Sequence, residues 1–302
     1  MLSLLLSSLL ALAQAAPTTK SAAPSNSVPA NLIRDYATVS KFAKTVSGPQ
    51  TLLSNWTNSD ICSWNGFFCA VNPDTNDLSL ASIDFNGFQM TGNLKLTGWI
   101  DKLADLALLH LNSNSFSGEI PDFSQMQYLY ELDLSNNKFS GAFPEKVFTA
   151  HGLTFLDLRY NRFTGAIPAQ TFTTYPQIEA LFLNNNRFSG QIPASIAGFQ
   201  GNYLSLANNQ LSGPIPASLA SAANLKELTA LGNKFSGEIP QGLGALSQLE
   251  VFDVSNNRLT GAVPEDLCAI QTLKALVVSG NKISSTLGPN CQRALANGIL
   301  KM

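Results

Sequence analysis

The chain has little charge, few histidines and few thiols. Only 13% of its 302 residues are charged, and it contains two histidines and four cysteines. A formal net charge of −2 argues against a nucleic-acid-binding protein, because such binding needs a basic face. The sequence also lacks G-x-S-x-G, H-E-x-x-H and paired-carboxylate motifs, so we expect no enzyme activity, no cofactor and no bound metal.

Long apolar runs are confined to the N-terminus. Residues 1–16, "MLSLLLSSLLALAQAA", predict a signal peptide, since Leu2–Ala13 is too short to span a bilayer and Ala13-Gln14-Ala15 fits the cleavage pattern. Residues 17–30 are rich in Pro, Ser and Thr and predict a flexible leader. We therefore expect a secreted protein of the extracellular space or cell wall, without a transmembrane segment in the mature chain.

Residues 31–79 predict an N-terminal cap. Apolar residues recur at helical spacing from Asn31 to Val46, and the stretch "CSWNGFFC" follows with little periodicity. The sequon Asn55-Trp56-Thr57 predicts a glycan on Asn55.

Residues 80–287 repeat the frame L-x-x-L-x-L-x-x-N-x-[FL]-[ST]-G-x-[IVF]-P nine times, with a period of about 24 residues. The first positions are Leu80, Leu106, Leu129, Leu153, Ile178, Gly201, Leu225, Leu249 and Leu273. This pattern predicts an α/β fold: a right-handed leucine-rich-repeat solenoid with a concave parallel β-sheet.

Each fixed position has a predicted structural role. Leucines at alternate positions enter the core from a short strand. The asparagine at the ninth position predicts a ladder of amides that satisfy the backbone where the chain leaves the strand: Asn114, Asn137, Asn161, Asn186, Asn209, Asn233, Asn257 and Asn281. The apolar residue two positions later predicts a hydrophobic spine.

The cysteines fit this register. Cys268 and Cys291 lie at nearly equivalent places in neighbouring coils, about 4.8 Å apart, within the range of a disulfide. Cys62 and Cys69 close the other end. We expect two structural disulfides, with residues 288–302 as the C-terminal cap and tail.

The repeat frame and the "CSWNGFFC" cap together resemble the plant-type extracellular leucine-rich-repeat class, which includes polygalacturonase-inhibiting proteins and receptor-kinase ectodomains. Copies such as "LYELDLSNNKFSGAFP" and "LTFLDLRYNRFTGAIP" most resemble the N-terminal domains of leucine-rich-repeat extensins. Those relatives imply cysteines within the repeats and a Ser/Pro-rich tail. Here the repeats have none before Cys268 and the chain stops at Met302, so we expect a tail-less relative.

The variable positions should carry the function. The third, fifth, seventh and eighth residues of each copy are expected to face outward from the strands. Copies two to six gather apolar side chains there: Leu108, Phe155, Tyr160, Phe182 and Tyr203. Arg159 and Tyr160 replace the Ser-Asn or Asn-Asn of the neighbouring copies. This clustering predicts a partner-binding surface.

Acidic residues lie beside these apolar ones. Glu131, Asp133 and Asp157 predict an acidic strip that favours a cationic partner. His110 is expected between Asp84 and Asp133 in one column, ion-paired and with a raised pKa, as a mild pH sensor. One histidine with two carboxylates is a thin ligand set, so we predict no metal site there. An open face also lacks the pocket that a glycosidase acid needs.

The sequence thus predicts a non-catalytic protein that binds a protein or peptide partner on its concave face. By resemblance, the partner is a cationic signalling peptide or, alternatively, a wall-degrading enzyme such as a polygalacturonase. A structural wall protein that contacts polysaccharide, or an ice-binding protein, is the other class. Ice binding favours a regular uncharged array, which the Asp, Glu and Arg residues interrupt.

Overall fold

The computed structural model describes residues 28–302. The predicted signal peptide, residues 1–16, and nearly all of the predicted leader lie outside this range. No helix within residues 28–302 combines the length and apolar character needed to cross a membrane.

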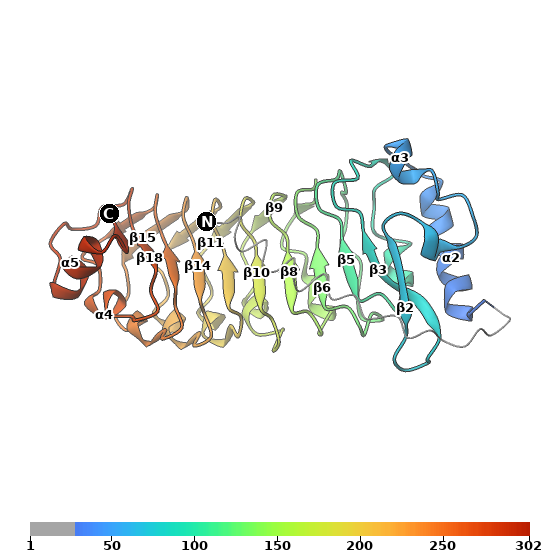
Figure 1. The fold of residues 1–302 in the computed structure, drawn as a ribbon. Helices are drawn as coiled ribbons and strands as arrows, with labels where there is room; N and C mark the ends of the chain where they lie inside the picture. The colour runs from blue at the N-terminus through green and yellow to red at the C-terminus, as the bar shows by residue number, and fades with distance from the viewer. Residues whose placement is uncertain (1–27) are drawn as a thin grey trace.

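The molecule is a row of stacked coils whose main β-sheet runs along its whole length (Figure 1). The nine repeat strands are parallel neighbours in chain order, as the repeats predict. They are β3 (Leu78–Asp84), β5 (Leu108–His110), β6 (Glu131–Asp133), β8 (Phe155–Asp157), β10 (Ala180–Phe182), β12 (Tyr203–Ser205), β14 (Glu227–Thr229), β16 (Val251–Asp253) and β18 (Ala275–Val277). The predicted leucine-rich-repeat solenoid is confirmed.

The N-terminal end of the sheet is covered by helical and extended segments. These are α2 (Ala30–Ala43), β1 (Val46–Ser47), α3 (Gln50–Leu53), η1 (Ile61–Ser63) and β2 (Phe67–Val71), with β4 (Thr91–Gly92) paired antiparallel to β1. Strand β2 adds antiparallel to β3, and the Cys62–Cys69 disulfide joins it to η1. Phe42 stacks on Trp99 with ring centroids 3.8 Å apart, so α2 closes the apolar core at this end.

Short 3₁₀ helices line the side of most coils away from the main sheet. They are η2 (Ile100–Lys102), η3 (Glu145–Thr149), η4 (Ala169–Phe172), η5 (Ala194–Gly198), η6 (Ala217–Ser221) and η7 (Leu243–Ala245). Between them and the strands lies one continuous core of buried Leu, Ile and Phe side chains. The predicted spine is part of it, and Phe163 stacks between Phe139 and Phe188.

The ninth-position asparagines form the expected ladder. Asn186 donates to the carbonyls of Leu158 and Leu183 at 2.9 and 3.2 Å, and its Oδ1 accepts from the Phe163 amide at 3.1 Å. The other ladder asparagines bridge coils in the same way. Each buried amide therefore satisfies backbone groups of two coils at once.

A second parallel sheet was not predicted. Its strands are β7 (Ser140–Gly141), β9 (Arg162–Gly165), β11 (Arg187–Gly190), β13 (Gln210–Gly213), β15 (Lys234–Glu238) and β17 (Arg258–Thr260). Figure 1 shows β9, β11 and β15 in a second row behind the main sheet. The strands are only two to five residues long, which is too short for a clear alternation in the sequence.

The C-terminal end closes with α4 (Glu265–Cys268), α5 (Pro289–Ala296) and β19 (Leu300–Lys301). Strand β19 pairs with β18 and completes the sheet of eleven strands. The Cys268–Cys291 disulfide links α4 to α5 with a Cα–Cα distance of 5.0 Å. Both predicted disulfides are therefore present.

Candidate binding surface on the main sheet

The register of the main sheet brings the variable positions into columns. The third residues Glu131, Phe155 and Ala180 are direct neighbours, and so are the fifth residues Asp133, Asp157 and Phe182. Most side chains in these two columns are partly exposed. The seventh position differs from the prediction, because Ser135, Asn184, Ala207 and Ser255 are buried in the turn after the strand.

The fifth-position aspartates have a structural role that the sequence analysis missed. Asp84, Asp133, Asp157 and Asp253 each accept a hydrogen bond from the backbone N–H two residues later, at 2.8–3.0 Å. This is the turn that Asp and Asn side chains stabilise locally. Their recurrence therefore reflects the end of the strand at least as much as recognition of a cation.

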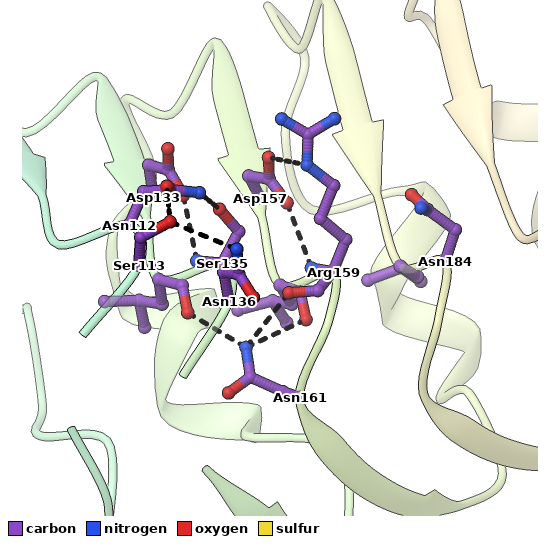
Figure 2. A network of polar contacts seen from close by, with 12 residues as sticks. Asn112, Ser113, Asp133, Ser135, Asn136, Asp157, Arg159, Asn161 and Asn184 are labelled. Atoms are coloured by element: carbon purple, nitrogen blue, oxygen red, sulfur yellow. Dashed lines mark hydrogen bonds and ion pairs between the residues drawn. The ribbon is translucent and has the colours of Figure 1, made fainter. Parts of the chain in front are cut away.

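The predicted acidic strip is wrong for Asp157, which is buried. Its side chain has 0% exposed surface, so it presents no free carboxylate to a partner. Burial, and then the charge of Asp133, raise the pKa of Asp157 well above its ordinary value, although Arg159 opposes this. The aspartate instead lies beneath Arg159, whose Nε is 2.8 Å from Oδ2 (Figure 2).

Arg159 is held between charge and aromatic rings. Its guanidinium carbon lies 5.3 Å from the centroid of the Phe182 ring, which is a cation–π distance. Phe182 in turn meets Phe155 edge to face, with centroids 5.7 Å apart. The Arg159 side chain is only 16% exposed, so its orientation is fixed before any partner arrives. We call Phe155, Asp157, Arg159, Tyr160 and Phe182 the Arg159 cluster.

Tyr160 has an unusual backbone. The eighth residue of every copy has a positive φ, and the other copies use Gly87, Ser113, Asn136, Asn185, Asn208, Gly232, Asn256 and Gly280 there. Tyr160 adopts φ +53° with an aromatic side chain, a conformation that costs a non-glycine residue free energy. The residue is 50% exposed, so burial offsets only part of this cost. Strain of this kind is typical of functional positions.

His110 lies in the predicted column between Asp84 and Asp133, but its direct partner is a different residue. Its Nε2 is 2.9 Å from Oε2 of Glu131, a third-position residue of the next coil. Burial lowers the pKa of His110, yet the Glu131 hydrogen bond and the charges of Asp133, Glu131 and Asp84 together raise it. The predicted ion pair and raised pKa are therefore present, with Glu131 as the acceptor.

The remaining predicted residues lie farther from the cluster. Leu108 and Tyr203 are each two strands away from Phe155 in the third column, and both are partly exposed. Phe68, which the sequence analysis did not select, lies beside Ser82 at the end of the same face and is 55% exposed. The position of Phe68 on this face follows from the pairing of β2 with β3, which the repeat pattern does not predict.

Asn55 and His151 add little further chemistry. The Asn55 amide nitrogen donates to the Ser63 carbonyl, and its oxygen accepts from the Asn65 N–H at 3.1 Å. His151 is exposed in a turn. Within residues 28–302, no three His, Cys, Asp or Glu side chains are grouped so that they could hold a metal ion.

Comparisons with known proteins agree with the repeats. Residues 127–188, 202–222 and 248–270 match family models described as leucine rich repeat. Over 103 residues the chain is 43% identical to "Leucine-rich repeat extensin-like protein 1" of Arabidopsis thaliana, covering 33% of this chain and 14% of that protein. The predicted resemblance to leucine-rich-repeat extensins is thus confirmed, although the match covers only a small part of that relative.

Solved structures share the fold over most of the chain. The leucine-rich-repeat ectodomain of the plant membrane receptor kinase GASSHO1/SCHENGEN3 from Arabidopsis thaliana, in complex with CASPARIAN STRIP INTEGRITY FACTOR 2, gives a TM-score of 0.73 at 27% identity. The alignment covers 85% of this chain and 34% of that one. A plant ice-binding protein gives 0.67 at 23% identity over 88% of this chain and 92% of its own, which shows the fold alone.

Proposed function

We propose that the chain is a secreted, non-catalytic protein that binds an extracellular protein or peptide on its main sheet. The observation that carries this proposal is Tyr160, an exposed aromatic residue in a left-handed turn where most other copies have Asn or Gly. A solenoid gains nothing from this residue in folding, so its benefit lies in a contact with a partner.

The Arg159 cluster has the features of a binding hot spot. Arg and Tyr dominate such sites, and a guanidinium that is already oriented loses little entropy on binding. Asp157 holds Arg159 in place at 2.8 Å, and Phe182 supports its other side. The partner therefore offers an apolar or aromatic group to Phe155, Tyr160 and Phe182.

Charge on either side of the cluster favours a partner with basic residues. Glu131 and Asp133 precede the cluster, and Glu227 and Asp253 follow it on strands of the same sheet. All four are partly exposed. Glu131 also pairs with His110, and Arg159, between them, already contacts Asp157. A cationic peptide along this face would gain attraction at both ends.

Solved relatives support the general mode of binding. The ectodomain of GASSHO1/SCHENGEN3, which shares the fold, is in complex with CASPARIAN STRIP INTEGRITY FACTOR 2. A leucine-rich-repeat face suits an extended ligand, because each coil adds one set of variable side chains.

Affinity capture from extracellular fluid and cell-wall extract tests the proposal. The bait is the secreted chain, and the informative variant is Arg159→Ser/Tyr160→Asn. This variant gives copy four the "DLSNN" of copy three, so the turn stays compatible with the fold. The control Arg293→Ser/Ile33→Asn removes one arginine and one exposed apolar residue from the two caps.

We expect a partner that the normal chain and the control capture and the copy-four variant loses. Its identity separates a peptide from a wall-degrading enzyme, and so separates signalling from enzyme inhibition. Equal capture by all three baits would contradict the proposal.

A further inference from the structure

Strand β2 brings an aromatic side chain of the N-terminal cap onto the main sheet. Phe68 pairs directly with Ser82 of β3, and Ser82 pairs with Leu108 of β5. Directly paired residues point to the same face of a sheet, so Phe68 extends the third-position column by one strand. Phe68 is 55% exposed, and the other two residues are partly exposed. The face therefore begins with an apolar residue that the repeats do not supply.

Ser82 is a small residue between two larger apolar ones. Phe68 and Leu108 are each one strand away from it, and neighbouring strands lie about 4.8 Å apart. The two apolar residues are therefore roughly 10 Å from each other, which leaves room for one apolar side chain in contact with both. We call Phe68, Ser82 and Leu108 the cap anchor.

The face is acidic between the cap anchor and the Arg159 cluster. Glu131 follows Leu108 in the third column. Asp84 and Asp133 lie on either side of His110 in the fifth column, and all four polar residues are partly exposed. The imidazole of His110 lies 2.9 Å from Oε2 of Glu131, and when protonated it offsets one carboxylate of the three. This stretch therefore favours a basic group on a ligand.

The distances along the column match an extended peptide that lies across the strands. Ser82 and Phe155 are separated by three strand spacings, or about 14 Å. Four residues of an extended peptide span about 13 Å, and its alternate side chains point to the same side. The first, third and fifth residues of such a peptide thus face the sheet, and the third lies midway, close to Glu131.

We propose that the main sheet binds an extended peptide segment with an apolar first residue, a basic third residue and an apolar fifth residue. One apolar side chain lies on Ser82 between Phe68 and Leu108. The basic side chain meets Glu131, and the other apolar side chain contacts Phe155 in the Arg159 cluster. The pattern is the same in both chain directions. This inference rests on the proposed function and adds the length and the residue pattern of the ligand.

A helical ligand fits these positions less well. An α-helix returns to the same face about every 5.4 Å, so its third and fourth contacts fall about 11 and 16 Å from the first. The separation of Ser82 and Phe155 lies between these two values. An extended segment instead places its side chains about 6.6 Å apart, close to half of the 14 Å separation.

Selection from a library of random linear peptides, with the normal chain as bait, tests the pattern. Two variants change the cap anchor in opposite ways. Phe68→Ser removes one apolar neighbour of the bound side chain, and Ser82→Phe fills the space that this side chain would occupy. The control Ile33→Ser removes a similarly exposed apolar residue from helix α2.

We expect the normal chain and the control to enrich peptides with the full pattern. Both cap-anchor variants should enrich peptides that keep only one apolar residue, two positions from the basic one. A synthetic peptide with the full pattern should bind each variant about tenfold more weakly than the normal chain. Alanine in place of its apolar residue at the cap anchor should weaken binding to the normal chain but not further to the variants.

Three results would overturn the inference. They are the same pattern from all baits, a different spacing of the apolar residues, and no enrichment by the normal chain. The last result, together with capture of a folded protein that needs the Arg159 cluster, would leave the proposed function in place. Failure of both the peptide selection and the partner capture would reject the main sheet as a binding face.

Discussion

The Nε of Arg159 lies 2.8 Å from Oδ2 of Asp157, a carboxylate without exposed surface. The same aspartate accepts the backbone N–H of Arg159 at 2.9 Å through its other oxygen. One arginine thus covers the carboxylate that orders its own turn. The neighbouring copy makes the same backbone bond between Asp133 and Ser135 without such a cover. Copy four has therefore added a side chain that the turn itself does not need.

Asp157→Asn should stabilise the protein, and more so at higher pH. Burial raises the folded-state pKa of Asp157 well above the unfolded value of about 3.9. Its contribution to stability is therefore complete below about pH 4 and is lost as pH rises through the folded pKa. Asparagine mimics the protonated form, so the rise in Tm over the normal chain should grow as pH increases from about 4 towards the folded-state pKa of Asp157.

Asp253→Asn is the matched control for this pH series. Asp253 accepts the equivalent backbone hydrogen bond but is partly exposed. Its replacement therefore shows how Tm changes when a carboxylate that is not fully buried loses its charge. A stabilisation by Asp157→Asn that became smaller with rising pH would contradict the raised folded-state pKa of Asp157.

Tyr160→Asn should raise the free energy of unfolding by about 1 kcal/mol, because asparagine tolerates the left-handed backbone better than tyrosine. Denaturant unfolding measures this. Asn136→Tyr, which puts tyrosine into the equivalent turn of copy three at φ +57°, should lower stability by a similar amount. If neither substitution changed the free energy of unfolding, Tyr160 would not be strained, and the argument that it is a functional residue would fail.

The features of the fold that recur in each copy could be predicted from the sequence. The features that depend on contacts between particular side chains of adjacent coils could not. Nine strands, the asparagine ladder and the two disulfides follow from positions that recur in each copy. The left-handed eighth position could also have been recognised, because most copies have Asn or Gly there. Burial of Asp157 depends on Arg159 and Phe182, and no pattern within one copy contains that information.

Local charge shows a related limit. A net charge of −2 describes the whole chain and hides the exposed cations Arg162, Arg187, Lys234 and Arg258 on strands of the second sheet. The tenth positions Arg162 and Arg187 are 25 residues apart in sequence but belong to adjacent strands, since Arg187 pairs with Thr164. Only the stacking of the coils turns this periodic signal into a continuous surface.

Asn186→Ala should lower the free energy of unfolding by about 3 kcal/mol. The Asn186 amide is 8% exposed, and its loss leaves the Leu158 carbonyl and the Phe163 N–H without their side-chain partner in the core. Each unsatisfied buried group costs about 1–3 kcal/mol. Denaturant unfolding measures the change, and Asn297→Ala, at an exposed position with a negative φ, serves as the control. Equal effects at the two positions would argue against the ladder as a stabilising element.

Glu131→Gln should lower the pKa of His110, because it removes both the hydrogen bond to a carboxylate and a nearby negative charge. NMR titration of the imidazole measures this, with Glu227→Gln as a control on the same face. In the normal chain the folded-state pKa is raised, so the stabilisation by His110 is complete below about pH 6.5 and is lost as pH rises through the folded value. The stability difference between the normal chain and Glu131→Gln should therefore be largest in acid. A difference that instead grew above pH 7 would show that Glu131 acts by packing, and His110 would have no role as a pH sensor.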